Sequence, residues 1–256
     1  MKPILLDLWG FKIYGYGLMI AIGIISAVLL LSKRAKEKGY NEDHILNMTI
    51  IAVISGVLGG KILHIITDFK FVISDPSSII KNFGEGFVIY GSIIGGALGA
   101  YIYCKKKQWD VLEVFDLITP SLPLAQGFGR IGCLFAGCCY GAETNVPWAI
   151  VFKESPFAPS NVHLHPTQIY SAIFNFVLAI FLIWYDKNNK VKGRTFSMYL
   201  ICYSVGRFLV EFLRDDPRGN VGVLSTSQFI SLFIFILGIA LYNIYKIKER
   251  RTKIEG

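Results

Sequence analysis

Two arginines lie inside apolar stretches of this chain. Arg130 belongs to the glycine-rich run 127–141, and Arg207 to the run 206–216, four residues before Glu211. A cation at membrane depth is unfavourable unless it faces a protein interior, water or an anion. A guanidinium forms a planar fork that suits phosphate, so we expect both arginines to converge on a lipid phosphate. The alternative is that Arg207 only pairs with Glu211, because residues four apart share a helix face.

Three of the five cysteines, Cys133, Cys138 and Cys139, follow the first arginine in the same run. Their odd number and close spacing argue against a disulfide framework. The spacing C-x4-C-C is not typical of zinc sites, so we expect small packing residues that hold no metal and accept no lipid. Cys133 follows the arginine by three residues and is expected to touch the bound phosphate. A metal site that adds His163 and His165 is the alternative.

The composition indicates an integral membrane protein. The chain has 256 residues, of which 53% are hydrophobic and 17% charged, with a mean hydropathy of +0.50. Soluble domains are usually about 25% charged. The net charge of +8 gathers in blocks between apolar runs, which favours cytoplasmic loops over nucleic-acid binding. We expect one membrane domain over residues 1–256, no nucleic-acid partner and no removable signal peptide.

Seven apolar segments predict an all-α protein with seven transmembrane helices. The fourth segment contains Pro120 and Pro123, which should kink or break it. Glycines in the third segment should allow tight helix packing. An interfacial arm over residues 68–85 is expected between the second and third helices. The seven segments are residues 14–31, 45–66, 87–104, 111–136, 168–185, 196–213 and 228–245.

Positive charges predict the orientation in the membrane. Sixteen basic residues follow the first, third, fifth and seventh segments, whereas seven lie on the opposite side. Cytoplasmic loops carry the excess of Lys and Arg, so we expect the N-terminus outside and the C-terminus in the cytoplasm. Lys61 lies at membrane depth, where it is either buried or reaches an interface. His64 on the same segment is expected to serve packing or the interface.

Tyr16 and Tyr90 lie at the predicted outer ends of their segments. Tyrosines are common at membrane interfaces, which is one interpretation of both residues. The other is that their hydroxyl groups donate hydrogen bonds to a lipid headgroup.

These motifs, taken in order, resemble the prolipoprotein diacylglyceryl transferases of bacterial inner membranes. That family moves a diacylglyceryl group from phosphatidylglycerol to the thiol of the lipobox cysteine of a preprolipoprotein, and glycerol-1-phosphate leaves. Each segment alone is a weak signal, but their order is kept across nearly the whole chain. The matching segments are residues 16–19, 59–61, 91–96, 129–132, 147–148 with Phe152, 165–170 and 207–214.

The resemblance implies an enzyme of the bacterial cytoplasmic (inner) membrane that uses no cofactor. It implies that the arginines hold the phosphate, and that the partners are phosphatidylglycerol, the signal peptide of a preprolipoprotein and membrane lipids. The expected catalytic residues are Arg130, Arg207 and Tyr90. The expected substrate-binding residues are Tyr16, Arg130, Cys133, Gly141, Arg207 and Glu211.

Four positions depart from the family pattern. Tyr90 stands where the family has His, Cys133 where it has Asn, and Cys138 and Ser171 where it has Glu. The group that takes the proton from the substrate thiol is therefore open. A paralogue with another lipid or thiol acceptor is one alternative. A membrane anion transporter and a redox or metal protein built on the cysteines are the others.

Overall fold

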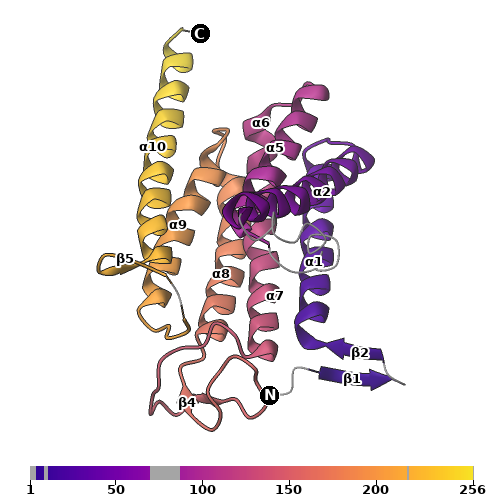
Figure 1. Ribbon diagram of the computed structural model, residues 1–256. Coiled ribbons are helices and arrows are strands. Elements are labelled where there is room, and N and C mark those ends of the chain that lie inside the picture. Colours follow the sequence, from indigo (N-terminus) through magenta and orange to yellow (C-terminus); the bar gives the residue numbers. More distant parts are fainter. Residues whose placement is uncertain (1–3, 9–10, 70–86, 218, 256) are drawn as a thin grey trace. The chain divides into compact units, whose positions relative to one another are not determined.

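The computed structural model describes residues 4–8, 11–69, 87–217 and 219–255 (Figure 1). Helices dominate this part of the chain, as the composition predicts. Among the described helices, four segments are long and apolar enough to cross a membrane: Gly15–Glu37, Glu42–Thr67, Thr167–Asn188 and Thr226–Ile247. This finding supports a membrane protein. That all seven predicted segments cross the membrane stays a prediction.

The chain divides into two compact units, residues 31–114 and residues 1–30 with 115–256. The smaller unit contains α2 (Glu42–Thr67) and α5 (Ile89–Lys106). These helices meet backbone to backbone, because a Cβ atom added at Gly91 would lie 2.3 Å from the carbonyl oxygen of Gly59. The tight packing predicted for the glycines of the third segment is confirmed. The predicted interfacial arm falls mostly on residues 70–86, which lie outside the described residues.

Two basic groups on α2 have partners within the smaller unit. Lys61 is buried, with its Nζ 5.4 Å from the centre of the Phe87 ring. The Nδ1 atom of His64 lies 3.0 Å from a carboxylate oxygen of Asp68. The structure thus favours the buried interpretation of Lys61.

The larger unit is a helical bundle (Figure 1). In it α8 packs against α7 and α9, and α9 packs against α10. Glycines again set the close approaches, because the Phe176 ring covers Gly127 and the Phe174 ring covers Gly206. The unit takes the first part of α1 (Gly15–Glu37) and most of its remaining structure from α7 (Ser121–Ala136), α8 (Thr167–Asn188), α9 (Arg194–Glu211) and α10 (Thr226–Glu255).

The predicted fourth span is broken in two, as its prolines indicate. The helix α6 (Val111–Ile118) ends before Pro120, which stands at the N-terminal cap of α7. Pro123 lies in the first turn of α7, where a missing N–H interrupts no helical hydrogen bond. The carboxylate of Asp116 on α6 then accepts hydrogen bonds from the backbone N–H groups of Gly193 (2.6 Å) and Phe196 (2.8 Å), which fixes the start of α9.

The segment 137–166 packs against the end of α7 in a small buried core. Its strands β3 (Ile150–Val151) and β4 (His163–Leu164) pair in antiparallel fashion. Leu164 of β4 belongs to a buried cluster with Leu134, Phe152 and Ala158. The other described strands also form antiparallel pairs: β1 (Ile4–Leu8) with β2 (Phe11–Tyr14), and β5 (Asn220–Val221) with β6 (Leu224–Ser225).

Candidate active site

Arg130 on α7 and Arg207 on α9 line the same small cleft of the larger unit. The two arginines are 77 positions apart in the sequence, and α8 packs between their helices. The cleft is mainly apolar, so a charge inside it is screened less than at an open surface. Its other lining residues are Ser171, Phe174, Asn175, Tyr203, Gly206 and Val210.

Arg207 is held in place by its neighbours. Its Nη1 lies 2.9 Å from Oε2 of Glu211, and its Nη2 donates a hydrogen bond of 2.8 Å to the hydroxyl of Ser227. Glu211 is 1% exposed and also accepts a hydrogen bond of 2.7 Å from Ser225. Arg207 therefore pairs with Glu211, as the alternative predicts, and it still lines the cleft. The network orients the guanidinium in advance of any ligand.

The surroundings of Arg130 are different. Within the described part of the chain it makes no hydrogen bond or ion pair, although it is half-buried on α7. Nearby, the buried side chain of Asn175 donates to the backbone carbonyl of Ser171 at 2.7 Å. Because the side-chain nitrogen of Asn175 makes this bond, its Oδ1 points away from the Ser171 carbonyl. This Oδ1 has no hydrogen-bond partner among the described residues. Beside the positioned Arg207, the cleft thus offers a ligand a second cation, Arg130, and one acceptor, the Asn175 Oδ1.

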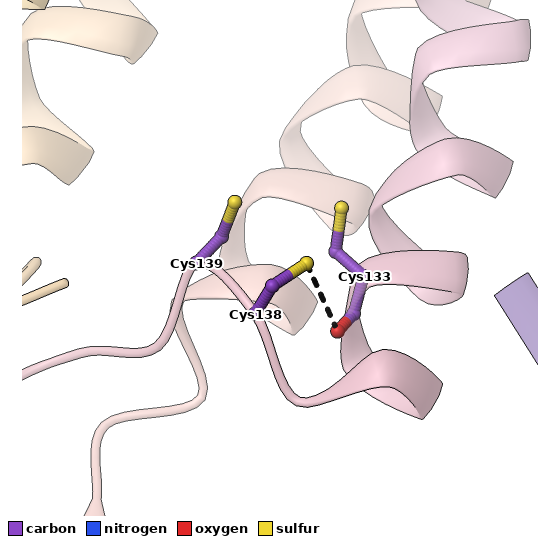
Figure 2. A group of neighbouring side chains, drawn as sticks. All are labelled: Cys133, Cys138 and Cys139. Atoms are coloured by element: carbon purple, nitrogen blue, oxygen red, sulfur yellow. Dashed lines mark hydrogen bonds between the residues drawn. The ribbon is translucent and has the colours of Figure 1, made fainter. Parts of the chain in front are cut away.

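The three cysteines lie together at the end of α7. Their sulfur atoms are all within 4.8 Å of one another (Figure 2). Figure 2 shows the Cys138 side chain pointing toward Cys133. The Cys138 sulfur lies 3.8 Å from the backbone carbonyl oxygen of Cys133. The chain reverses at Gly137, which has a φ of +73° that glycine adopts easily. Cys139 adopts a φ of +59°, which is uncommon for a residue with a side chain.

Buried side chains at the start of α8 hold this turn. Thr167 donates to the carbonyl of Cys139 at 2.8 Å, and Gln168 donates to the carbonyl of Cys138 at 2.8 Å. Both donors are 1% exposed. A hydrogen bond made by a buried side chain fixes position firmly, because breaking it leaves a polar group unsatisfied. His163 lies in β4, and His165 follows this strand. Neither histidine belongs to the group of possible metal ligands that the three cysteines form among the described residues.

Two arginines, Arg214 and Arg130, lie near the cysteine turn. The Arg214 guanidinium forms a bidentate pair with Asp216, at 2.9 and 2.7 Å. Burial opposes its charge, but the bonds to Asp216 and the nearby negative groups outweigh this, so the pKa of Arg214 is raised. Hydrogen bonds from the two neighbouring thiols lower the pKa of Cys139, and the charges of Arg214 and Arg130 lower it further.

The remaining predicted site residues differ in their surroundings. Tyr16 is half-exposed in the first turn of α1, beside Gly132 of α7. Gly141 is buried, and an added Cβ there would lie 2.6 Å from the Cβ of His165. Its role in the structure is to let two chain segments meet closely. Tyr90 is exposed near the start of α5 in the smaller unit, so its place beside the arginines stays a prediction.

Three residues near the arginines are not predicted from the sequence: Asn175 and Tyr203 line the cleft, and Ser227 accepts a hydrogen bond from Arg207. Asn175 carried a usable signal, because a lone amide in the apolar run 172–183 is unfavourable in lipid unless it has a function. Tyr203 and Ser227 resemble many other interfacial polar residues. Only the packing of α9 against α10 shows that Ser227 meets Arg207.

Several known proteins are similar to this chain over most of its length. The family model "Prolipoprotein diacylglyceryl transferase" matches residues 3–244. The phosphatidylglycerol–prolipoprotein diacylglyceryl transferase of Clostridium tetani (strain Massachusetts / E88) is 62% identical over 250 residues, which cover 98% of this chain and 100% of that protein. A second enzyme of that name, from Clostridium perfringens (strain 13 / Type A), is 61% identical over 251 residues, 98% of both chains. One from Clostridioides difficile (strain 630) is 35% identical over 254 residues, 99% of both chains. The match includes α7, the cysteine turn and α9, and the chain belongs to the prolipoprotein diacylglyceryl transferase family.

Proposed function

We propose that this protein transfers a diacylglyceryl group from phosphatidylglycerol to the lipobox cysteine thiol of a preprolipoprotein. The names of its relatives supply the reaction and both substrates. The observation that carries the proposal is the cleft shared by Arg130 and Arg207. Two guanidinium groups at one apolar cleft suit a single phosphate, which each of them can bind through its planar fork.

The reaction explains why the arginines matter. The substrate thiolate attacks the glycerol carbon that bears the phosphate, an S–C bond forms, and the C–O bond breaks. The electron pair leaves on the phosphate oxygen, so glycerol-1-phosphate departs with more negative charge. Donors placed in advance around the departing group stabilise the transition state. Arg207 meets this need because Glu211 and Ser227 hold it, whereas Arg130 is available to the phosphate.

The proposed setting is the bacterial cytoplasmic membrane, with seven spans and the N-terminus outside. The asymmetry of basic residues supports this orientation. It puts the segment 137–166 and the cysteine turn on the outer face. A preprolipoprotein leaving the cytoplasm would present its lipobox cysteine at that face, and phosphatidylglycerol would enter from the surrounding lipid. Tyr16 and Tyr90 are proposed headgroup donors, and Gly141 is proposed to shape the substrate path.

A transfer assay tests the function directly. The purified protein is placed in vesicles of phosphatidylglycerol with a synthetic lipobox peptide, and mass spectrometry follows the peptide. We expect the peptide to gain one diacylglyceryl group. A peptide with Ser in place of the acceptor Cys, and vesicles of phosphatidylethanolamine alone, are the controls. Folded protein that leaves the Cys peptide unmodified, or that conducts anions across the vesicles instead, would contradict the proposal.

A further inference from the structure

We propose that Cys133, Cys138 and Cys139 bind one zinc ion, and that this ion takes the substrate thiol as its fourth ligand. The inference rests on the proposed function for the identity of that thiol. It favours the metal alternative over the sequence-based expectation that the cysteines are only packing residues. The role is catalytic, because the ion would activate the nucleophile of the reaction.

The sulfur positions fit such an ion. Zinc binds thiolate sulfur at about 2.3 Å, so three sulfurs around one ion lie about 3.8 Å apart. The three sulfurs here are within 4.8 Å of one another before any ion is present. Small rotations of the side chains would close the difference. Each of the three thiols is free rather than joined in a disulfide.

The backbone also holds the sulfurs in this arrangement. Two buried side chains, Thr167 and Gln168, bind the carbonyls of the cysteine turn, and Cys139 is kept in a left-handed conformation. Packing residues need no such support, because a small apolar side chain fills space equally well in several orientations. Uncommon backbone conformations persist where the surroundings enforce them, and they gather at functional sites.

The charges suit a zinc thiolate group better than they suit neutral thiols. Three thiolates with one Zn²⁺ carry a net charge of −1. Arg130 precedes Cys133 by three residues on the same helix α7, so its positive charge lies close to the sulfur group. That charge would stabilise the anionic group beside the cleft that Arg130 lines.

The proposed reaction also needs a group to deprotonate the substrate thiol. Among the residues that the structure describes, those lining the cleft include no His, Asp or Glu. Glu211 is nearby, but it is engaged with Arg207 and Ser225. A thiol that coordinates a metal ion loses its proton outright. The proton passes to water as the Zn–S bond forms, and the bound thiolate then attacks the glycerol carbon while glycerol-1-phosphate leaves with the electron pair.

Metal analysis of the purified full-length protein is the first test. We expect one zinc ion per chain in the parent, and loss of stoichiometric zinc in each of Cys133→Ser, Cys138→Ser and Cys139→Ser, because each variant lacks one of the three thiolate ligands. Cys104→Ser and Cys202→Ser are the matched controls and should keep their zinc, since both residues lie outside the sulfur group. Parent protein without stoichiometric zinc, zinc that persists in the three variants, or copper in its place would overturn the zinc site.

Cobalt exchange tests the substrate ligand without measuring transfer. Co²⁺ in a thiolate site gives absorption bands that report its coordination. We expect these bands to change when the Cys lipobox peptide is added and to stay unchanged with the Ser peptide. Unchanged bands with the Cys peptide would overturn the fourth-ligand role. Because this readout does not require catalysis, a positive result together with failed transfer would disprove the proposed reaction and leave the metal site standing.

Discussion

At the scale of single residues, the two arginines of the cleft have different surroundings. Arg207 is tied to Glu211 and Ser227, whereas Arg130 has neither a hydrogen bond nor an ion pair among the described residues. In the proposed mechanism Arg207 is positioned before the substrate arrives, and Arg130 gains its partner with the substrate. Removing Arg207 would also leave a buried carboxylate uncompensated, so its loss affects stability as well as catalysis.

We therefore expect Arg130→Ala and Arg207→Ala each to reduce transfer by about 10²–10³-fold, as for the loss of a donor to a developing anion. Arg207→Ala should also destabilise the fold by about 3–5 kcal/mol, while Arg130→Ala should melt close to the parent temperature. Lys at either position should restore activity only in part, because an ammonium lacks the fork. Near-normal transfer by Arg130→Ala would remove the phosphate clamp from the mechanism.

Asn175 gives a second prediction at this scale. Its Oδ1 is a buried acceptor in the cleft, turned away from the Ser171 carbonyl that holds its nitrogen. A hydroxyl of the glycerol headgroup could donate to it. We expect Asn175→Ala to raise the KM for phosphatidylglycerol about tenfold, since a hydrogen bond to a neutral group contributes roughly 0.5–1.5 kcal/mol. An unchanged KM with a lower kcat would show that Asn175 acts on the chemistry instead.

The sequence reaches some of these residues and not others. Arg130 and Arg207 are recognisable because charge in an apolar run has few explanations. The sulfur group is not recognisable from its C-x4-C-C spacing, because its geometry depends on the turn at Gly137 and on donors from another helix. Ser227 is a partner of Arg207 only through tertiary packing, which leaves no local pattern in the sequence.

At the scale of elements, glycines decide how closely the helices approach. In the smaller unit α2 and α5 meet with the backbone of Gly59 against that of Gly91, and Gly95 similarly faces Ser55. Without a hydrophobic force between helices in lipid, such close packing is a main source of association. A side chain at one of these glycines would separate the helices along their contact.

Gly91→Ala tests this contact. The added Cβ would lie 2.3 Å from the Gly59 carbonyl oxygen, so the helices must shift, and we expect a loss of about 1–3 kcal/mol. Gly17→Ala on α1 is the matched control, because no atom lies within 4 Å of its added Cβ. Thermal unfolding of both variants in the same detergent gives the comparison. Equal melting temperatures would show that the close approach contributes nothing to stability.

Element boundaries show where local patterns stop being informative. The break between α6 and α7 follows from Pro120, whose effect on a helix is local. The helix α10 continues to Glu255, beyond the predicted end at residue 245, because the basic tail is compatible with helix even where it leaves the apolar segment. The core of the segment 137–166 brings Leu134 together with Phe152 and Leu164, and such distant pairing is not visible in a hydropathy profile.

At the scale of the whole molecule, the family and the apolar helices agree on a membrane enzyme. The cleft, the cysteine turn and their supporting donors all belong to the larger unit. Tyr90 and Lys61 belong to the smaller unit, and their part in the reaction is a separate prediction. The roles of the arginines and of the cysteine turn can therefore be tested by variants in the larger unit alone.

The orientation in the membrane is the prediction on which substrate access depends. Reporter fusions after Lys36, Lys106 and Lys190 should report the cytoplasm, because the basic residues concentrate in those loops. A fusion at Ser155 should report the outer face, together with the cysteine turn that Ser155 contacts through the carbonyls of Ala136 and Gly137. Replacing the lysines at 105, 106 and 107 with Gln should weaken the bias of that loop and serves as the control for charge. A cytoplasmic signal at Ser155 with an external one at Lys106 would place the cleft where an exported preprolipoprotein does not arrive, and the proposed reaction would then lack its acceptor.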